Sequence, residues 1–335
     1  MKRIISLLLA LALSLSLAAC AAPAEKADGG KLQIVTTLFP YYDFARAIAQ
    51  DRADVTLLLS PGREAHSFEP TPLDAVTISE ADVFLYNGGE GEYWVESMLD
   101  AAGEHIAVAS RMMDYVDALN EGYVEGMQGA DGHDHDHEHG SHDDHDHDHE
   151  EDEHDSDEIE YDEHIWTSPK NAVVLCRAVC DAICRADAEN AAFYRANCEN
   201  YCAQLEDLDA RFAALCESAP RRLLIFADRF PMLYFCREYG LDYRAAFHGC
   251  SGDTEPSLAT IKFLIDKVED ENIPVVYTID FGTKKVAAVV SECTGAAIET
   301  LYSMQTVSRA DFDAGETYLT LMERNFEALR KGLNE

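Results

Sequence analysis

The chain has 335 residues, of which 63 are Asp or Glu and 26 are Lys or Arg, so its formal net charge at pH 7 is −37. Such an acidic surface repels nucleic acids and attracts cations, which excludes a nucleic-acid partner from the expected functions. The length is sufficient for two domains of ordinary size.

The first twenty residues have the pattern of an export signal. Two basic residues precede an apolar run of 14 residues, Ile4 to Leu17, which is shorter than a transmembrane span. The adjoining Leu-Ala-Ala-Cys resembles a bacterial lipobox, in which the cysteine, here Cys20, is lipidated; an ordinary signal peptide is the alternative. Residues 21–30 are small and polar, as in a flexible tether. We therefore expect an exported protein that is lipid-anchored on the outer face of the cytoplasmic membrane.

Strands and helices alternate in the first part of the mature chain. Apolar and β-branched runs predict strands within residues 31–40, 55–60, 81–88 and 105–110. Amphipathic patterns predict helices within residues 41–50, after Pro72, and within residues 93–102. This alternation indicates an N-terminal α/β lobe with a parallel sheet, which we place at residues 31–168.

An acidic, histidine-rich insert interrupts this lobe. Residues 131–158 contain no apolar side chain, so they cannot bury enough surface to offset their ordering entropy and are expected to be disordered. Their imidazoles alternate mainly with carboxylates and offer weak, replaceable metal contacts. The nine histidines of this accessory loop are His133, His135, His137, His139, His142, His145, His147, His149 and His154.

Two long helical patterns follow the insert. The first runs from Pro169 to about Ala186, with Ser168 as the N-cap, and the second spans residues 189–217. We expect them to act as one long, nearly uninterrupted rigid connection, with a connecting helix at residues 169–187. Strands are then predicted within residues 221–228, 243–247, 273–280 and 296–301, with a last helix at 318–332. The predicted fold is therefore two Rossmann-like α/β lobes, the second at residues 188–335.

Nine cysteines follow the lipobox, an odd number for a fully disulfide-bonded exported protein. Cys176, Cys180 and Cys184 recur every four residues, as do Cys198 and Cys202, so each set lies along one helix face. We interpret them as small core residues on buried stripes. A metal or redox cluster is the alternative, and the pattern leaves the redox state open.

Four side chains lie where ligands for a transition metal are expected, in loops at strand ends beside a cleft between lobes. His66 follows the second predicted strand, and His164 precedes the connecting helix, next to Trp166. Asp228 and Asp280 each end an apolar strand. Taken singly, each has an ordinary alternative, which is a surface histidine or an aspartate that caps a helix.

Four segments of the chain occur in a characteristic order. They are HSFEPTPLDAVTISEADVFLYNGGEGEYWVESML, EHIWTSPKNAVVLCRAV, the stretch from REYGLD to TEPS, and TYLTLMERNFEAL. Together they resemble the zinc/manganese-specific solute-binding lipoproteins of bacterial ABC importers, whose zinc-type members often carry a His-rich acidic loop. The resemblance covers essentially the whole mature chain. It implies two α/β lobes joined by a rigid helix, a metal held in the cleft between them, and delivery to a membrane permease driven by a cytoplasmic ATPase.

The resemblance also implies a ligand set. His66 matches the first ligand of the family, His164 matches the second, and Asp280 falls where the family usually has a carboxylate. The third position departs from the family, which commonly has a His-Asp pair, because an alanine precedes Asp228 here. Asp228 is the preferred replacement; His248, after the next strand, and a water molecule are the alternatives.

Two imidazoles with one or two carboxylates suit Zn²⁺, the expected transported ligand, whereas Mn²⁺ prefers more oxygen ligands. The His-rich loop favours zinc, although manganese stays open as an alternative. A hydrolase is disfavoured because the chain has no H-E-x-x-H motif, so we expect no enzymatic activity. A surface metal buffer or adhesin that acts through the loop alone is the other alternative. We expect a monomer.

Overall fold

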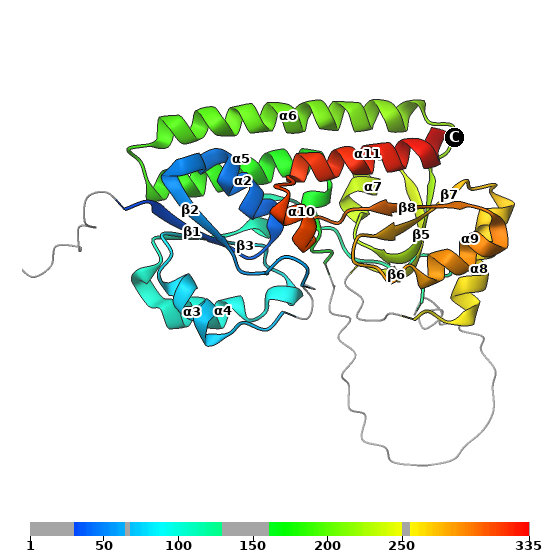
Figure 1. Cartoon of the computed structure of the whole chain (residues 1–335), viewed down its shortest axis with the longest axis horizontal. Coiled ribbons are helices and arrows are strands. Elements are labelled where there is room, and N and C mark those ends of the chain that lie inside the picture. Colours follow the sequence, from blue (N-terminus) through cyan, green and yellow to red (C-terminus); the bar gives the residue numbers. More distant parts are fainter. Residues whose placement is uncertain (1–29, 64–67, 129–160, 250–254, 335) are drawn as a thin grey trace, which may run out of the picture.

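The computed structural model of the chain describes residues 30–63, 68–128, 161–249 and 255–334. Within these residues the chain forms two α/β lobes, each built on a parallel sheet of four strands (Figure 1). Each of the eight predicted strands overlaps a strand of the structure. The two-lobed α/β fold predicted from the sequence is confirmed.

The first sheet has the strand order β2-β1-β3-β4 and is apolar at its centre. Its strands are β1 (Leu32–Thr36), β2 (Ala53–Leu57), β3 (Val83–Tyr86) and β4 (Val108–Arg111), and its helices are α2 (Phe39–Ala49), α3 (Pro72–Ser79) and α4 (Val95–Ala102). Ile34 of β1 pairs with Val83 of β3, and both are fully buried, as expected for central parallel strands. The carboxyl ends of these strands therefore meet at one edge of the sheet.

The second sheet has the order β6-β5-β7-β8. Its strands are β5 (Leu223–Phe230), β6 (Asp242–His248), β7 (Val275–Ile279) and β8 (Ala297–Leu301). Its helices are α7 (Leu233–Tyr239), α8 (Leu258–Asp270), α9 (Lys285–Thr294), α10 (Arg309–Asp313) and α11 (Tyr318–Asn334). The register of β5 shifts between Phe226 and Arg229, so an irregularity lies at Asp228. Such irregularities often re-aim a side chain next to a functional site.

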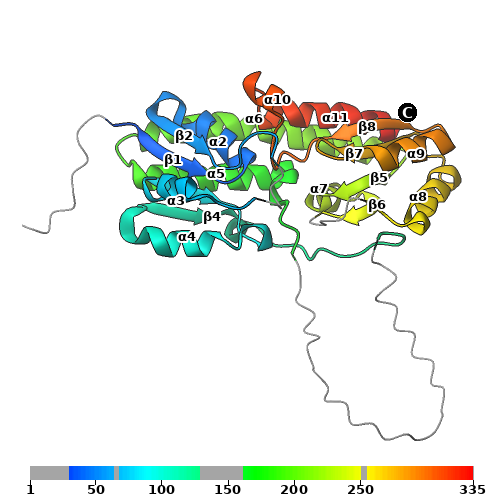
Figure 2. The ribbon, with the colours of Figure 1, turned by 60° about the horizontal axis from the view of Figure 1, so that its bottom comes forward.

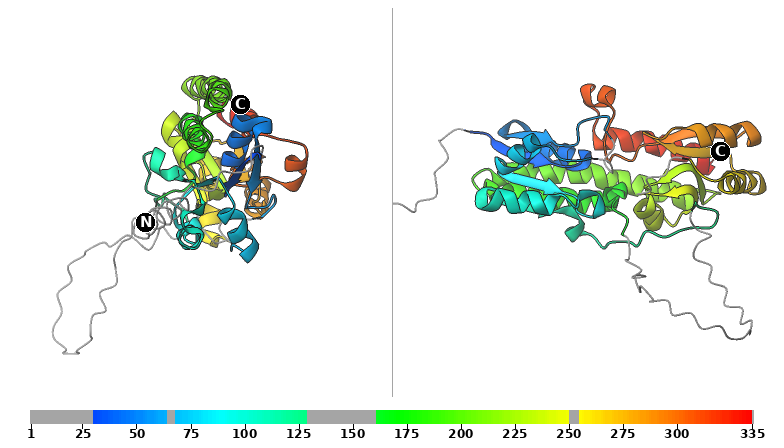
Figure 3. Two further views of the ribbon diagram at one scale, coloured as in Figure 1. Left: turned by 90° about the vertical axis from the view of Figure 1, so that its left-hand side faces the viewer. Right: turned by 90° about the horizontal axis from the view of Figure 1, so that it is seen from below.

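The connection between the lobes differs from the expectation of one nearly uninterrupted helix. The chain forms two helices, α5 (Pro169–Ala186) and α6 (Ala191–Ser218), which pack side by side (Figure 3). The turn between them closes on Asp187, whose carboxylate accepts hydrogen bonds from Asn190 N at 3.3 Å, Asn190 Nδ2 at 2.7 Å and the Tyr194 hydroxyl at 2.6 Å. Ser168 caps α5 as predicted, by accepting from Asn171 N.

The helix that runs beside both lobes is α6, which contacts α2 of the first lobe and α7 of the second (Figure 1). A buried carboxylate ties these elements together. Asp43 of α2 accepts hydrogen bonds from the Tyr201 hydroxyl of α6 at 2.6 Å and from the backbone N–H of Tyr318, the first residue of α11, at 2.9 Å. Three helices are thus joined at one point in the core.

Residues 117–128 cross from the first lobe to the second, where they run beside β6 (Figure 2). Gln128 donates its backbone N–H to the Ala246 carbonyl at 2.9 Å and accepts the N–H of Ser257 through its side chain at 2.9 Å. Glu125 pairs with Arg244 of β6 at 3.3 Å. This crossing brings side chains from late in the first lobe next to the second sheet.

Candidate metal centre

Two adjoining pockets lie where the carboxyl ends of the two sheets approach each other. The first is lined by residues that follow strands of the first sheet, and the second by residues that end or follow strands of the second sheet. Gln305, which follows β8, lines both pockets, and His164 lines the second. A crevice outside the carboxyl ends of parallel strands is the usual ligand site of α/β folds.

His164 is held in a fixed orientation inside this cleft. Its Nδ1 atom lies 3.1 Å from Oδ1 of Asp162, which also accepts the backbone N–H of His164 at 2.7 Å. The Trp166 ring packs against the imidazole edge-on, with the ring centroids 5.6 Å apart. Because Nδ1 faces the carboxylate, Nε2 is the atom that could bind a metal, as in the carboxylate–histidine–zinc arrangement.

The electrostatic surroundings of His164 favour a positive charge. Burial by itself lowers the pKa of this imidazole, but the carboxylates of Asp162, Glu121 and Glu163 outweigh it and hold the pKa above the usual 6.5. The same field attracts a cation into the cleft. A metal ion and a proton would therefore compete for this side chain.

His248 lies close to this centre and carries its own carboxylate partner. Its Nδ1 atom is 3.2 Å from Oε2 of Glu121, a residue of the crossing segment whose side chain is 7% exposed. A Cβ atom built on Gly249 would lie 3.0 Å from Oε1 of Glu121 and 3.1 Å from Cε1 of His164. Glu121 and His164 thus both border Gly249, the residue that follows His248.

Asp228 is hydrogen-bonded to the last residue of β7 and lies against the turn that follows it. Its carboxylate accepts the N–H of Arg229 at 2.9 Å and the N–H of Ile279 at 3.3 Å. A Cβ atom on Gly282 would come within 1.7 Å of Oδ2 of Asp228, so only glycine fits at this place in the turn. Asp228, which the sequence indicated as a ligand candidate, therefore also fixes the loop that carries Asp280.

Asp280 follows the last residue of β7 and is partly exposed. Its Oδ1 atom accepts the N–H of Ser303 at 3.1 Å, and Ser303 lines the same pocket as His164. Asp280 itself lines a neighbouring pocket with Phe281, which is shared with the His164 pocket. The carboxylate therefore lies at the margin of the cleft.

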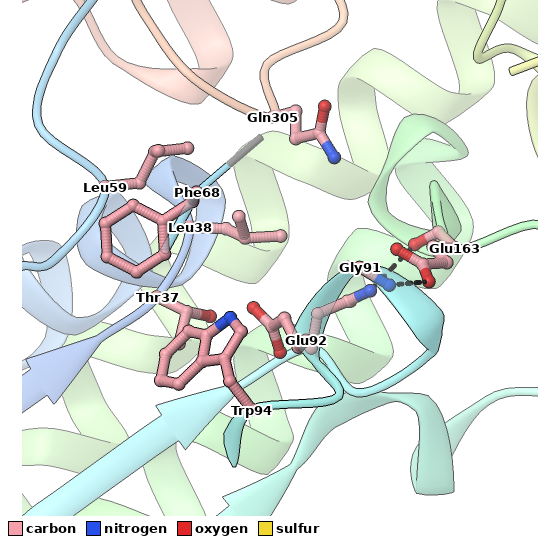
Figure 4. Close-up of a pocket in the computed structure, with 10 residues that line it drawn as sticks. Thr37, Leu38, Leu59, Phe68, Gly91, Glu92, Trp94, Glu163 and Gln305 are labelled. Carbon is pink, nitrogen blue, oxygen red and sulfur yellow. Dashed lines mark hydrogen bonds between the residues drawn. The ribbon is translucent and has the colours of Figure 1, made fainter. Parts of the chain in front are cut away.

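The first pocket combines aromatic rings with two buried carboxyl groups (Figure 4). Phe68 and Trp94 form one wall, with ring centroids 5.4 Å apart. Burial raises the pKa of Glu92 to about 7 and also raises that of Glu163. Glu163 accepts the N–H of Gly91 at 2.7 Å, which anchors the backbone next to His164 to the loop after β3.

The predicted ligands are only partly brought together. His66, the nine histidines of the accessory loop and Cys20 lie outside the described residues. In the part of the chain that the structure describes, no group of three His, Cys, Asp or Glu side chains with ligand atoms within 4.8 Å includes a cleft residue. His164 and Asp280 share one cleft, whereas Asp228 faces the turn after β7.

The sequence reading missed the residues that support His164. The role of Asp162 could have been predicted from the sequence, because a carboxylate two residues before a candidate histidine ligand can orient that histidine. No local sequence pattern indicated Glu121, because it reaches the second lobe only through the segment that crosses between the lobes. His105 was read as the start of a strand, but it ends a 3₁₀ turn before β4 and is exposed.

Over most of its length the chain is similar to proteins named for zinc uptake or zinc binding. A family model described as the zinc-uptake complex component A, periplasmic (ZnuA), matches residues 34–332. The chain is 31% identical over 308 residues to the high-affinity zinc uptake system protein ZnuA of Bacillus subtilis, a match that covers 91% of this chain and 88% of that protein. It is 30% identical to the zinc-binding lipoprotein AdcA of Streptococcus pneumoniae over 99% of this chain but 61% of AdcA. The chain thus spans less than two thirds of AdcA.

Two solved structures have the same architecture. The Zn(II)-bound ZnuA-like domain of Streptococcus pneumoniae AdcA matches with a TM-score of 0.71 and 26% identity, over 91% of this chain and 100% of that domain. The metal-dependent lipoprotein YcdH of Bacillus subtilis matches with a TM-score of 0.72 and 29% identity, over 90% of this chain and 100% of the other.

Proposed function

The chain belongs to the ZnuA family of periplasmic zinc-uptake components, and we propose that it captures Zn²⁺ outside the cytoplasm and delivers it to an ABC-type permease driven by a cytoplasmic ATPase. The family membership confirms the resemblance read from the sequence. The proposal rests mainly on His164, whose imidazole is buried and is oriented by Asp162 in a cleft between two α/β lobes. The relatives of this chain are named as zinc-uptake and zinc-binding proteins, which supports zinc as the ligand.

We assign His66, His164, Asp280 and Asp228 as the metal ligands, with His248 as the alternative to Asp228. An ionised carboxylate has about four lone-pair sites, so Asp228 could keep its backbone hydrogen bonds and still offer an oxygen to a metal. His248 would instead offer a nitrogen, with the Glu121 carboxylate 3.2 Å from its Nδ1 atom. Two or three nitrogen donors favour Zn²⁺ over Mn²⁺.

Capture and delivery need no chemical step, so we infer a binding protein and not an enzyme. The acidic surface draws Zn²⁺ towards the protein, the imidazoles at residues 133–154 hold it weakly, and the cleft takes it over. Zinc binding stabilises one relative arrangement of the two lobes. The stabilisation equals the difference in zinc-binding free energy between the two arrangements. The motion is small, because α6 contacts both lobes and Asp43 ties α2 to α6 and α11.

We place the protein as a monomer on the outer face of the cytoplasmic membrane, held by a lipid on Cys20. AdcA is named a lipoprotein, which supports this anchor. In residues 30–63, 68–128, 161–249 and 255–334, no helix combines the length and the apolar character that crossing a membrane requires.

A zinc titration of the mature protein against a competing chelator tests the assignment. The double variant His66→Ala/His164→Ala should lose the tight site, whereas His105→Ala, which removes an exposed histidine, should keep it. A tight site that survives in the double variant would refute the ligand assignment.

Two further measurements separate the alternatives. Native mass spectrometry of the protein without residues 131–158, with Zn²⁺ and Mn²⁺ in competition, reports the selectivity of the cleft alone. Cells that carry this deletion should grow poorly only when zinc is scarce. Complete loss of function would favour a surface buffer or adhesin that acts through the loop.

A further inference from the structure

The seam between α5 and α6 is lined by thiols. Cys176, Cys180 and Cys184 face it from α5, and Cys198 and Cys202 face it from α6. All five side chains are at most 7% exposed, and none forms a disulfide. The four-residue spacing predicted one cysteine-bearing face on each helix. In the structure these two faces lie against each other.

Three of these thiols form a compact group across the seam. The Sγ atoms of Cys176, Cys198 and Cys202 all lie within 4.8 Å of one another. Cys198 Sγ and Cys202 Sγ are 3.8 Å apart, and Cys198 Sγ is 3.8 Å from the carbonyl oxygen of Cys176. Cys180, one turn along α5, also interacts with Cys198. Cys198 is thus the centre of the group.

The spacing of Cys198 and Cys202 matches that of two sulfur ligands of one metal ion, and Cys176 Sγ lies within 4.8 Å of both. A tetrahedral site with Zn–S bonds of about 2.3 Å places its sulfur atoms about 3.8 Å apart. The two sulfur atoms of a disulfide lie at about 2.05 Å, much closer than the 3.8 Å between Cys198 Sγ and Cys202 Sγ. The thiols of Cys198 and Cys202 already have the separation that a metal requires.

We propose that Cys176, Cys198 and Cys202 form a second metal site, for a thiophilic divalent d¹⁰ cation such as Zn²⁺ or Cd²⁺, with Cys180 placed to become the fourth ligand. Binding exchanges three S–H protons for one cation, which gives the three-thiolate centre a net charge of −1. The Arg177 guanidinium interacts electrostatically with Cys198 and Cys202 and offsets this charge. The site does not depend on the cleft or on its proposed ligands.

The cation would join α5 to α6 in the manner of a structural zinc site. Because α6 contacts both lobes, a fixed α5–α6 pair stabilises the frame against which the lobes move. A ligand that binds the folded state and not the unfolded state raises the melting temperature, and the effect grows with the ratio of its free concentration to its dissociation constant.

A titration of the full chain with Cd²⁺, reduced and free of oxygen, tests this site. Sulfur-to-cadmium charge transfer absorbs in the ultraviolet, whereas imidazole and carboxylate ligands give no such band. We expect a band whose final amplitude corresponds to one thiolate-bound Cd²⁺ per chain, whatever further Cd²⁺ the cleft and the imidazoles at residues 133–154 take up. The band should persist in His164→Ala. Cys198→Ser should lose more than half of the band, and Cys216→Ser, at a buried thiol near the other end of α6, should keep it.

X-ray absorption of the wild-type Cd²⁺ protein makes the test independent of whether variants fold. Three or four sulfur neighbours support the site, whereas only oxygen and nitrogen neighbours overturn it. Absence of the band from the wild-type protein, or its full retention in Cys198→Ser, also overturns it. A disulfide between any two of Cys176, Cys198 and Cys202 also overturns it. Peptide mass spectrometry of the isolated protein, alkylated in denaturant without reductant, would detect that disulfide.

Discussion

The Nδ1 atom of His164 lies 3.1 Å from Oδ1 of Asp162, and both side chains are 1% exposed. The carboxylate also accepts the backbone N–H of His164, so one group fixes both the ring and the chain that carries it. A partner of this kind sets the tautomer of a ligating histidine and increases its basicity. The first two predictions follow from this pair.

Asp162→Asn should weaken zinc binding by about 10- to 100-fold, the range typical of lost partners of metal-bound histidines. The asparagine can still accept a hydrogen bond, but it lacks the charge that makes the imidazole a strong donor. Competition with a chromophoric chelator measures the affinity. Asp54→Asn, at an exposed aspartate paired with Lys31, is the matched control and should bind as the wild type does. An unchanged affinity in Asp162→Asn would show that the pair has no part in binding.

Zinc affinity should fall on acidification at a higher pH than an ordinary histidine would cause. The carboxylates around His164 outweigh the effect of its burial and hold its pKa above 6.5, and only the neutral imidazole binds metal, so protons displace zinc as the pH falls through that raised pKa. Dissociation constants measured between about pH 5.5 and 8.5 locate the transition. In Asp162→Asn the transition should move to lower pH. A transition at the same pH in both proteins would assign it to another group.

Much of the fold was predictable because its signals are local. Apolar runs that alternate with amphipathic segments indicated both sheets, and Ser168 before Pro169 marked the start of α5 correctly. The reversal between α5 and α6 was not predicted, because the two helical patterns, 169–186 and 189–217, lie only two residues apart and were expected to continue in one direction. The roles of Asp187 and Asn190 were not foreseen. Their side chains instead close a turn.

The surroundings of the cleft were less predictable, because residues far apart in the sequence meet there. His164 could be singled out from its neighbours, whereas the pairing of Glu121 with His248 depends on the segment that crosses between the lobes. The sequence identified Asp228 as a strand-end carboxylate and a ligand candidate, but not its contact with the turn after β7. Its fit against Gly282 depends on how β5 and β7 lie in the sheet.

The metal-free protein should lose stability as the pH rises from about 4.5 to about 7, because of Glu92. Burial raises the pKa of Glu92 from 4.5 to about 7, so the folded state holds a proton that the unfolded state releases earlier. The resulting stabilisation is fully present below pH 4.5 and is lost as the pH rises through about 7, by about 3 kcal/mol.

Glu92→Gln should remove this dependence, because an amide does not ionise. Urea unfolding in the presence of a chelator should show that Glu92→Gln gains stability relative to the wild type between about pH 4.5 and 7 and that the difference then levels off. Glu96→Gln, at an exposed position of α4, is the control and should follow the wild type. Parallel pH profiles for Glu92→Gln and the wild type would exclude Glu92 as the titrating group.

Gly282→Ala should lower both stability and zinc affinity, because the new methyl group would occupy the place of the Asp228 carboxylate. The added Cβ would lie 1.7 Å from Oδ2, so Asp228 must move and give up its hydrogen bond from Ile279 N. Overpacking of this kind costs about 1–3 kcal/mol, which urea unfolding measures. Gly122→Ala, where a Cβ meets no atom within 4 Å, should leave stability unchanged. If Gly282→Ala loses stability but binds zinc normally, Asp228 serves only the turn, and His248 becomes the preferred third ligand.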